Sequence, residues 1–333
     1  MRNSGEGNEM KILAVDDDEI ILELLEQVLL SIGYTDITTA LSADVALQRI
    51  DEAIDPFDCI LLDIQMPEMD GIELSGLIRD MPDYRETPVL MITAMSDKNY
   101  IDRAFQRGAT DYVTKPFDVM ELSARIRIAD RLAVDWKKKR EASRAGRSFH
   151  DLVGDEAKID LEQPVVIHDV DGVIDYNAMQ NYLAQLGRRA LFGSSVFAIK
   201  INEIEGLHGA MTNYEFKCLV TDVAEAITLA MAMRQHLVCY MGGGVFVSVT
   251  EDAGRLHVQS VLDDVKRTVL DMAMCYSDGR PMHVGFSVGS PVRMTLLFGQ
   301  SAPRAIQRAV ASARLSEFDG WERAPVRTSF LGA

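Results

Sequence analysis

The sequence predicts an α/β protein of two domains, the first built on a doubly wound sheet of five parallel strands. Its 333 residues suit two domains better than one. Short apolar runs alternate with amphipathic stretches five times between residues 11 and 134, and a second series begins near residue 161. Apolar residues make up 47 % of the chain, which is enough for ordinary hydrophobic cores.

In the first domain, each apolar run is followed by a stretch of helical periodicity. This order predicts a parallel sheet with helices on both faces, because consecutive parallel strands are joined by crossover helices. Ligand sites in such sheets form at the carboxyl ends of the strands. The predicted strands are 11–15, 37–40, 59–62, 89–93 and 112–114, and the predicted helices are 20–32, 42–53, 71–81, 97–107 and 118 onward.

The fifth helix is predicted to continue past the first domain. Apolar residues recur along it at intervals of four, three, four and three, at Leu122, Ile126, Ala129, Ala133 and Trp136. This spacing indicates a short heptad seam that could pair two chains in a homodimer. The alternative is a single amphipathic helix packed on its own domain, but the continuation into the charged stretch 137–141 favours pairing. The predicted domain bounds are 10–135 and 161–320, with a helical linker over 136–160.

The second domain is predicted to be α/β with a mixed sheet. Two of its strands flank Gly242-Gly243-Gly244, which predicts a hairpin about that turn. The predicted strands are 165–168, 196–201, 238–241, 245–250 and 282–288, and the predicted helices are 177–186, 215–233, 255–274 and 302–317.

Composition narrows the range of partners and locations. The net charge of −17 disfavours binding to nucleic acid or to an anionic membrane surface, and the basic run 137–140 is explained by a solvated helix face. The four cysteines show no spacing of a metal site. No apolar run is long enough to span a membrane, and the polar first ten residues do not resemble a signal peptide, so a cytoplasmic protein is expected.

Polar residues follow four of the strands predicted for the first domain. Asp16 and Asp17 follow the first strand, Asp63 ends the third, Thr93 ends the fourth and Lys115 follows the fifth. Because all five strands are parallel, these residues should lie at one edge of the sheet. Carboxylates gathered there repel one another unless a cation joins them, and hard oxygen ligands suit Mg²⁺.

Phosphoryl transfer to a carboxylate is the chemistry that this arrangement predicts. We expect Mg²⁺ to be held by Asp17, Asp63 and the backbone carbonyl of Gln65, with Asp16 assisting directly or through water. The Asp63 carboxylate would attack phosphorus and form an acyl phosphate.

Three further side chains complete the predicted site. Lys115 would supply positive charge to one phosphoryl oxygen, and the Thr93 hydroxyl would donate a hydrogen bond to another. Tyr112, three residues before Lys115, could swing inward once Thr93 moves toward the phosphate. Taken alone these signals are weak, since Asp17 or Asp18 could instead cap the helix that follows them.

Together, the residues described above and the segments around them resemble the response-regulator receiver family. The resemblance covers about the first 135 residues and implies that Asp63 accepts a phosphoryl group from a histidine kinase or phosphotransfer protein. It also implies that phosphorylation changes the surface of the fourth helix, fifth strand and fifth helix. The segments that carry it are 12–18, 62–71, 93–94 and 112–117.

The second domain resembles the diguanylate cyclase (GGDEF) family, whose signature turn is matched by Gly242-Gly243-Gly244. Segments 171–175, 197–202, 283–289 and 308–314 follow in the order of the family. The carboxylates that two-metal catalysis would need are missing, because Lys200 and Asn202 stand in the catalytic strand and Gly244 and Val245 in the turn. We therefore expect no enzyme here, and a domain that acts by contact with a protein partner or by dimerisation.

Other functions remain open for the second domain. One is a diguanylate cyclase with atypical ligands. Another is a phosphatase of the haloacid-dehalogenase type, because 165–173 resembles the nucleophile motif of that family, with Asp169 after a predicted strand. A DNA-binding regulator is disfavoured by the acidic balance and by the lack of a basic helix-turn-helix pattern.

Overall fold

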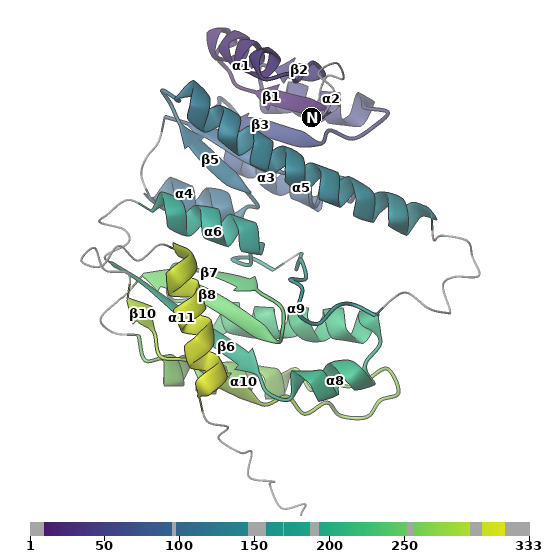
Figure 1. The fold of residues 1–333 in the computed structure, drawn as a ribbon, viewed down its shortest axis with the longest axis vertical. Coiled ribbons are helices and arrows are strands. Elements are labelled where there is room, and N and C mark those ends of the chain that lie inside the picture. Colours follow the sequence, from purple (N-terminus) through teal and green to yellow (C-terminus); the bar gives the residue numbers. More distant parts are fainter. Residues whose placement is uncertain are drawn as a thin grey trace, which may run out of the picture.

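The computed structural model describes residues 10–94, 98–145, 158–168, 170–186, 193–251, 256–293 and 302–316. Its N-terminal part is a five-stranded sheet with the order β2-β1-β3-β4-β5 (Figure 1). All four strand pairs are parallel, which confirms the fold predicted for the first domain. The strands are β1 (Ile12–Val15), β2 (Ile37–Ala40), β3 (Cys59–Asp63), β4 (Val89–Thr93) and β5 (Asp111–Thr114).

Helices cover both faces of this sheet, as crossover connections require. Buried side chains of α1 and α5 pack on one face, and those of α2, α3 and α4 pack on the other. Side chains of Asp18, Ser42 and Asp70 cap the first three helices and set where they begin. The helices are α1 (Glu19–Ser31), α2 (Ala43–Glu52), α3 (Gly71–Asp80), α4 (Lys98–Gln106) and α5 (Val119–Ala145).

The apolar stripe of α5 is used inside its own domain. Leu122, Ile126, Ala129 and Ala133 are buried against α1 and the sheet. Trp136, the next position, is partly exposed and lines a cavity between the two domains. The four buried positions therefore follow the single-helix alternative. The helix itself runs through Ala145, while 146–157 of the predicted linker lie outside the described residues.

The second domain is built on a sheet with the order β10-β6-β8-β7, to which β9 adds by pairing with β6. These strands pair antiparallel, and an isolated parallel bridge between Val173 and Val238 makes the sheet mixed. The predicted hairpin about Gly242-Gly243-Gly244 is confirmed. The strands are β6 (Ser194–Ile201), β7 (His236–Tyr240), β8 (Val245–Glu251), β9 (Phe286–Val288) and β10 (Val292–Arg293).

Two helices cover each face of this sheet. Side chains of α9 and α10 form one core with the sheet, and those of α6 and α11 pack on its other face. No helix of the described ranges combines the length and the hydropathy needed to cross a bilayer. The helices are α6 (Tyr176–Gln185), α8 (Ile204–Ala210), α9 (Asn213–Ala230), α10 (Val258–Asp271) and α11 (Ala302–Leu315).

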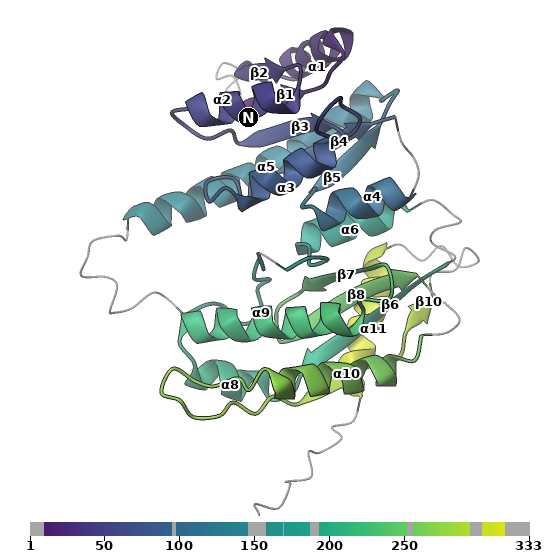
Figure 2. The same cartoon turned by 180° about the vertical axis from the view of Figure 1, so that it is seen from behind.

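One helix joins the two domains. Figures 1 and 2 both show α6 between α4 of the first domain and β7 of the second. Buried residues of α6, such as Met179 and Leu183, belong to a hydrophobic cluster that includes Phe105 on α4 and Cys239 on β7. The cluster is continuous across the boundary, so the two domains share apolar core.

Some predictions for the second domain were wrong. Residues 165–168 form no strand, although Val165 and Ile167 pack against its core. Only Phe286–Val288 of the predicted strand 282–288 is a strand. The short helix α8 and the two-residue strand β10 were not predicted. Without its strand, the phosphatase motif loses its structural context, and Asp169 lies outside the described residues.

Candidate functional site

Three carboxylates meet at the carboxyl edge of the first sheet. One carboxylate oxygen each from Asp16, Asp17 and Asp63 lies within 4.8 Å of the others. Asp16 and Asp63 are buried, whereas Asp17 is exposed. The sequence had placed these residues at one edge through strand order alone, and the structure brings them within reach of one small cation.

Lys115 joins the same cluster from the end of β5. Its Nζ atom lies 2.6 Å from Asp16 Oδ2 and 2.7 Å from Asp63 Oδ1. Burial alone would lower the pKa of Lys115, but its bonds to the two carboxylates raise it, so the ammonium remains charged. Burial raises the pKa of Asp63, and the bonds from Lys115 and the Gln65 backbone N–H only partly offset this.

The three aspartates that follow β1 have different roles. The Asp18 side chain accepts a hydrogen bond from the Ile20 N–H and caps α1, so the capping role falls to Asp18 and leaves Asp17 in the cluster. The Asp18 N–H in turn donates to Asp16 Oδ1 at 3.0 Å. These bonds fix the loop after β1 and aim Asp16 at Lys115.

Gly71 also shapes this site, and its role was not predicted from the sequence. A Cβ atom at Gly71 would overlap the backbone carbonyl oxygen of Asp63, so only glycine allows α3 to begin so close to the end of β3. The Gly71 N–H donates to the Ile64 carbonyl at 2.9 Å. The sequence feature that could have indicated this role is the pair Asp70-Gly71 directly before an amphipathic stretch.

Thr93 and Tyr112 lie close to the cluster but differ in setting. Thr93 ends β4 and is buried, and its carbonyl accepts from the Lys115 N–H at 2.7 Å. Tyr112 is already buried in this structure, with its ring edge-on to Phe105 at a centroid distance of 6.2 Å. Burial raises the pKa of Tyr112 to about 12, so its hydroxyl stays neutral.

The acidic cluster has the donor set that Mg²⁺ favours. It offers three hard carboxylate oxygens, and exposed Asp17 leaves room for water ligands. Lys115 neutralises part of the negative charge without filling the exposed side. An acidic pocket of this kind is typical of Mg²⁺ binding.

The glycine turn of the second domain presents a different picture. Gly242, Gly243 and Gly244 all have positive φ, between 59° and 92°. A Cβ at Gly242 would overlap the Glu162 carbonyl oxygen, and the Gly243 N–H donates to the Leu161 carbonyl at 2.6 Å. The preceding chain thus packs directly on the turn.

Lys200 and Asn202 at the end of β6, and Gly244 and Val245 at the turn, offer no carboxylate to a metal ion. Asn202 accepts a hydrogen bond from the Ser287 hydroxyl at 3.0 Å, which ties the end of β6 to β9. Lys200 lies two residues before Asn202, on β6, and is paired in register with Val245 at the start of β8. A cation in this position opposes the binding of a divalent ion.

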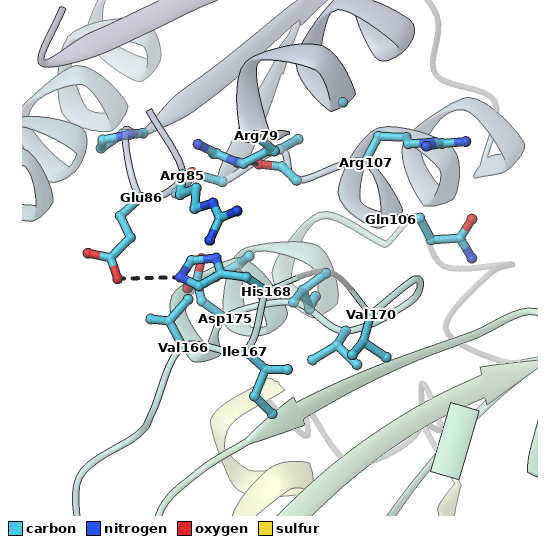
Figure 3. Close-up of a pocket in the computed structure, with 18 of the residues that line it drawn as sticks. Arg79, Arg85, Glu86, Gln106, Arg107, Val166, Ile167, His168, Val170 and Asp175 are labelled. Atoms are coloured by element: carbon cyan, nitrogen blue, oxygen red, sulfur yellow. Dashed lines mark hydrogen bonds and ion pairs between the residues drawn. The ribbon is translucent and has the colours of Figure 1, made fainter. Parts of the chain in front are cut away.

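A cavity of about 450 Å³ separates parts of the two domains. Figure 3 shows Arg85 and Glu86 of the first domain reaching toward His168 of the second, and His168 Nε2 lies 3.6 Å from Glu86 Oε1. Arg107 and Asp175 also line it, so both signs of charge are present. This mixture does not select one class of ligand.

Comparison with known proteins identifies the first domain. Residues 12–127 match the family model described as "Response regulator receiver domain". The chain is 42 % identical over 123 residues to the transcriptional regulatory protein KdpE of Staphylococcus aureus, covering 37 % of this chain and 51 % of that protein. It is 38 % identical over 152 residues to the response regulator PleD of Caulobacter vibrioides, covering 45 % of this chain and 32 % of that protein.

A solved structure is also similar to part of this chain. It is a putative response regulator from Chloroflexus aurantiacus, 35 % identical, and the match covers 37 % of this chain and 98 % of that one with a TM-score of 0.35. The chain spans about half of the KdpE protein and about a third of PleD. Residues 12–127 of this chain are therefore a response regulator receiver domain of a two-component system.

Proposed function

We propose that this chain is a phosphorylation-dependent response regulator that accepts a phosphoryl group on Asp63. A histidine kinase or a phosphotransfer protein would be the donor. The observation that carries this proposal is the contact of Lys115 Nζ with both Asp16 and Asp63, at 2.6 and 2.7 Å, beside Asp17. A single buried aspartate would be expected to be neutral or to pair with one cation. Asp63 instead shares the Lys115 ammonium group with a second carboxylate, that of Asp16.

The reaction follows from the positions of these groups. A carboxylate oxygen of Asp63 attacks phosphorus, the new O–P bond forms, and the P–N bond to the donor histidine breaks. The departing imidazole keeps the electron pair of that bond and takes up a proton. Lys115 remains charged and contacts a phosphoryl oxygen, while the Thr93 hydroxyl can donate to another. Mg²⁺ held by Asp17, Asp63 and the backbone carbonyl of Gln65, with Asp16 assisting, would neutralise the incoming phosphoryl oxygens.

Substitution of Asp63 tests the proposal. Asp63→Asn keeps the size of the side chain but removes the nucleophilic carboxylate, so labelling by acetyl phosphate with Mg²⁺ should fall to background. Intact-protein mass spectrometry would detect the added phosphoryl group. The matched control is Asp18→Asn, because Asp18 is a helix cap and asparagine caps equally well. Undiminished labelling of the Asp63→Asn protein would falsify the assignment.

For the second domain we propose a catalytically inactive, GGDEF-like output domain that acts by contact with a protein partner or by dimerisation. Three features support this: Lys200 in the strand, Gly244 and Val245 in place of acidic residues, and the Glu162 backbone against Gly242. A cyclase with atypical ligands is the competing function. Incubation with GTP and Mg²⁺ or Mn²⁺ should yield no cyclic dinucleotide by chromatography, and a product that accumulates with time would support the cyclase instead.

A further inference from the structure

Two helices on the same side of the receiver sheet expose large apolar side chains. Buried residues of α1 and α5 belong to one hydrophobic cluster, so both helices cover the same face of the sheet, the near face in Figure 1. Ile20, the second residue of α1, is 73 % exposed, and Met120, the second residue of α5, is 80 % exposed. Leu24 on α1 and Ile128 on α5 are also exposed. Apolar side chains gathered in this way on adjoining helices indicate a contact surface.

The outward side of α1 is acidic. Glu19, Glu23 and Glu26 are exposed along it, and the helix contains no basic residue. The exposed side chains of Ile20 and Leu24 lie among these glutamates in the sequence. This side of α1 therefore offers apolar contact area together with negative charge.

The outward side of α5 is basic. Arg127 and Arg131 are exposed on it, one helical turn apart. Asp130, which lies between them in the sequence, accepts a hydrogen bond from the Tyr34 hydroxyl at 3.1 Å, just beyond the end of α1. Asp130 is thus engaged inside its own chain, and the two arginines carry the charge of the exposed side.

The two helices also lie level with each other. Each follows a parallel strand, so both run back along the sheet in the same direction. Counted at 1.5 Å per residue from the helix starts, Ile20 and Met120 lie at the same height, and Glu26 and Arg127 lie at about 10 and 12 Å. Side chains in helices lean toward the N-terminus, and the longer arginine leans further, which brings its charge to the level of the glutamates.

A surface of this kind is complementary to itself. A half turn about an axis parallel to the helices, between α1 and α5, places the α5 of a second copy over α1 and its α1 over α5, at unchanged height. Each contact between an acidic and a basic side chain then occurs twice, as in any isologous interface. The second domain lies beyond α5 and away from α1 in Figures 1 and 2, so the two second domains point to opposite ends of such a pair.

We propose that the α1–α5 face of the receiver binds a second copy of this chain, with the glutamates of α1 against the arginines of α5 in both directions. Charge complementarity selects this partner, because the face carries both signs on separate helices and the half turn brings each sign against the other. The surface differs from the heptad seam, four positions of which are buried. The inference concerns assembly of the first domain and does not depend on phosphoryl acceptance by Asp63.

Charge reversal in the full chain tests the proposal. One variant is Glu23→Arg with Glu26→Arg, and the other is Arg127→Glu with Arg131→Glu. Either change places like charges at every contact, so the dimer dissociation constant from sedimentation velocity at low ionic strength should rise by about 100-fold. In an equimolar mixture, one chain is basic on both helices and the other is acidic on both. Opposite charges then meet at every contact, and we expect the mixture to form a heterodimer.

The matched control reverses two arginines of the second domain. Arg304 and Arg308 on α11 are exposed and have the same helical spacing as Arg127 and Arg131. Arg304→Glu with Arg308→Glu should leave the dissociation constant of the dimer unchanged. Added salt should weaken the unaltered dimer, because the paired groups are exposed before association.

Three results would overturn the proposal. They are an unaltered chain that stays monomeric up to about 100 μM, which would leave this face to a different protein, equal loss of the dimer in the α11 control, and a mixture that stays monomeric. Should a double variant fold poorly, Glu23→Arg and Arg127→Glu alone provide the same mixture test. Acetyl phosphate labelling of the unaltered chain is a separate measurement, so a failure here leaves the acceptor assignment standing.

Discussion

Two loop regions of this chain resemble sites of phosphate chemistry, and they differ in what surrounds them. At the receiver edge, Lys115 and three carboxylates converge, and glycine at position 71 lets the chain pass without filling the site. At the second-domain turn, Gly242 leaves space that the Glu162 backbone then occupies. The comparison teaches that a glycine turn predicts a backbone shape, while convergent charge predicts chemistry.

The sharpest way to break this comparison is to remove a lysine from each region. Lys115→Met should lower the initial rate of phosphorylation by acetyl phosphate by about 100-fold, because the phosphoryl oxygens lose a fixed charge in a partly buried site. Lys200→Met should leave that rate unchanged. A large effect of Lys200→Met, or none of Lys115→Met, would remove the distinction between the two regions.

A second pair of variants compares the glycines. Gly71→Ala forces a methyl group against the Asp63 backbone and should lower the free energy of unfolding by about 2–3 kcal/mol while also slowing phosphorylation. Gly244→Ala meets Ile204 Cβ at 2.9 Å and keeps an unfavourable φ of 71°, so it should cost about 1–2 kcal/mol and leave phosphorylation intact. Urea unfolding and acetyl phosphate labelling of the same preparations measure both effects.

The smallest effect is expected on stability, at Glu215, a carboxylate outside the proposed phosphorylation site. Bonds from Ser277 lower the pKa of Glu215 to about 2 from a model-compound value of 4.5. A lowered folded-state pKa stabilises the fold above pH 4.5, and this stabilisation disappears as the pH falls toward about 2. Glu215→Gln should therefore lower the urea midpoint modestly at pH 7, with a difference that shrinks below pH 4.5. Glu205→Gln, at an exposed position of α8, supplies the control for the loss of a surface carboxylate.

Much of the receiver could be predicted because local and global signals agree there. Each parallel strand is a short apolar run, and strand order alone places Asp16, Asp63 and Lys115 at one edge. The contact of Gly71 with the Asp63 backbone could not be predicted, since it depends on how closely α3 approaches β3.

Predictions were weaker where tertiary packing decides. The stripe of α5 was correctly recognised as apolar, but periodicity does not say which surface will cover it, and α1 does so. The run 165–168 has strand-forming residues yet pairs with no strand in the described structure. The hydrogen bond from Tyr182 to Asp102 joins residues 80 positions apart, and no local sequence pattern predicts such a contact.

The position of α6 has a consequence for how this chain can be divided. Its residues Met179 and Leu183 are as deeply buried as any in the second domain, but part of their cover comes from the receiver. A cut in the connecting segment before α6 would strip Phe105 of a neighbour and leave Tyr182 facing water. The domain boundary along the chain therefore does not coincide with the boundary between the hydrophobic cores. Either half expressed alone would expose apolar surface that is buried in the full chain.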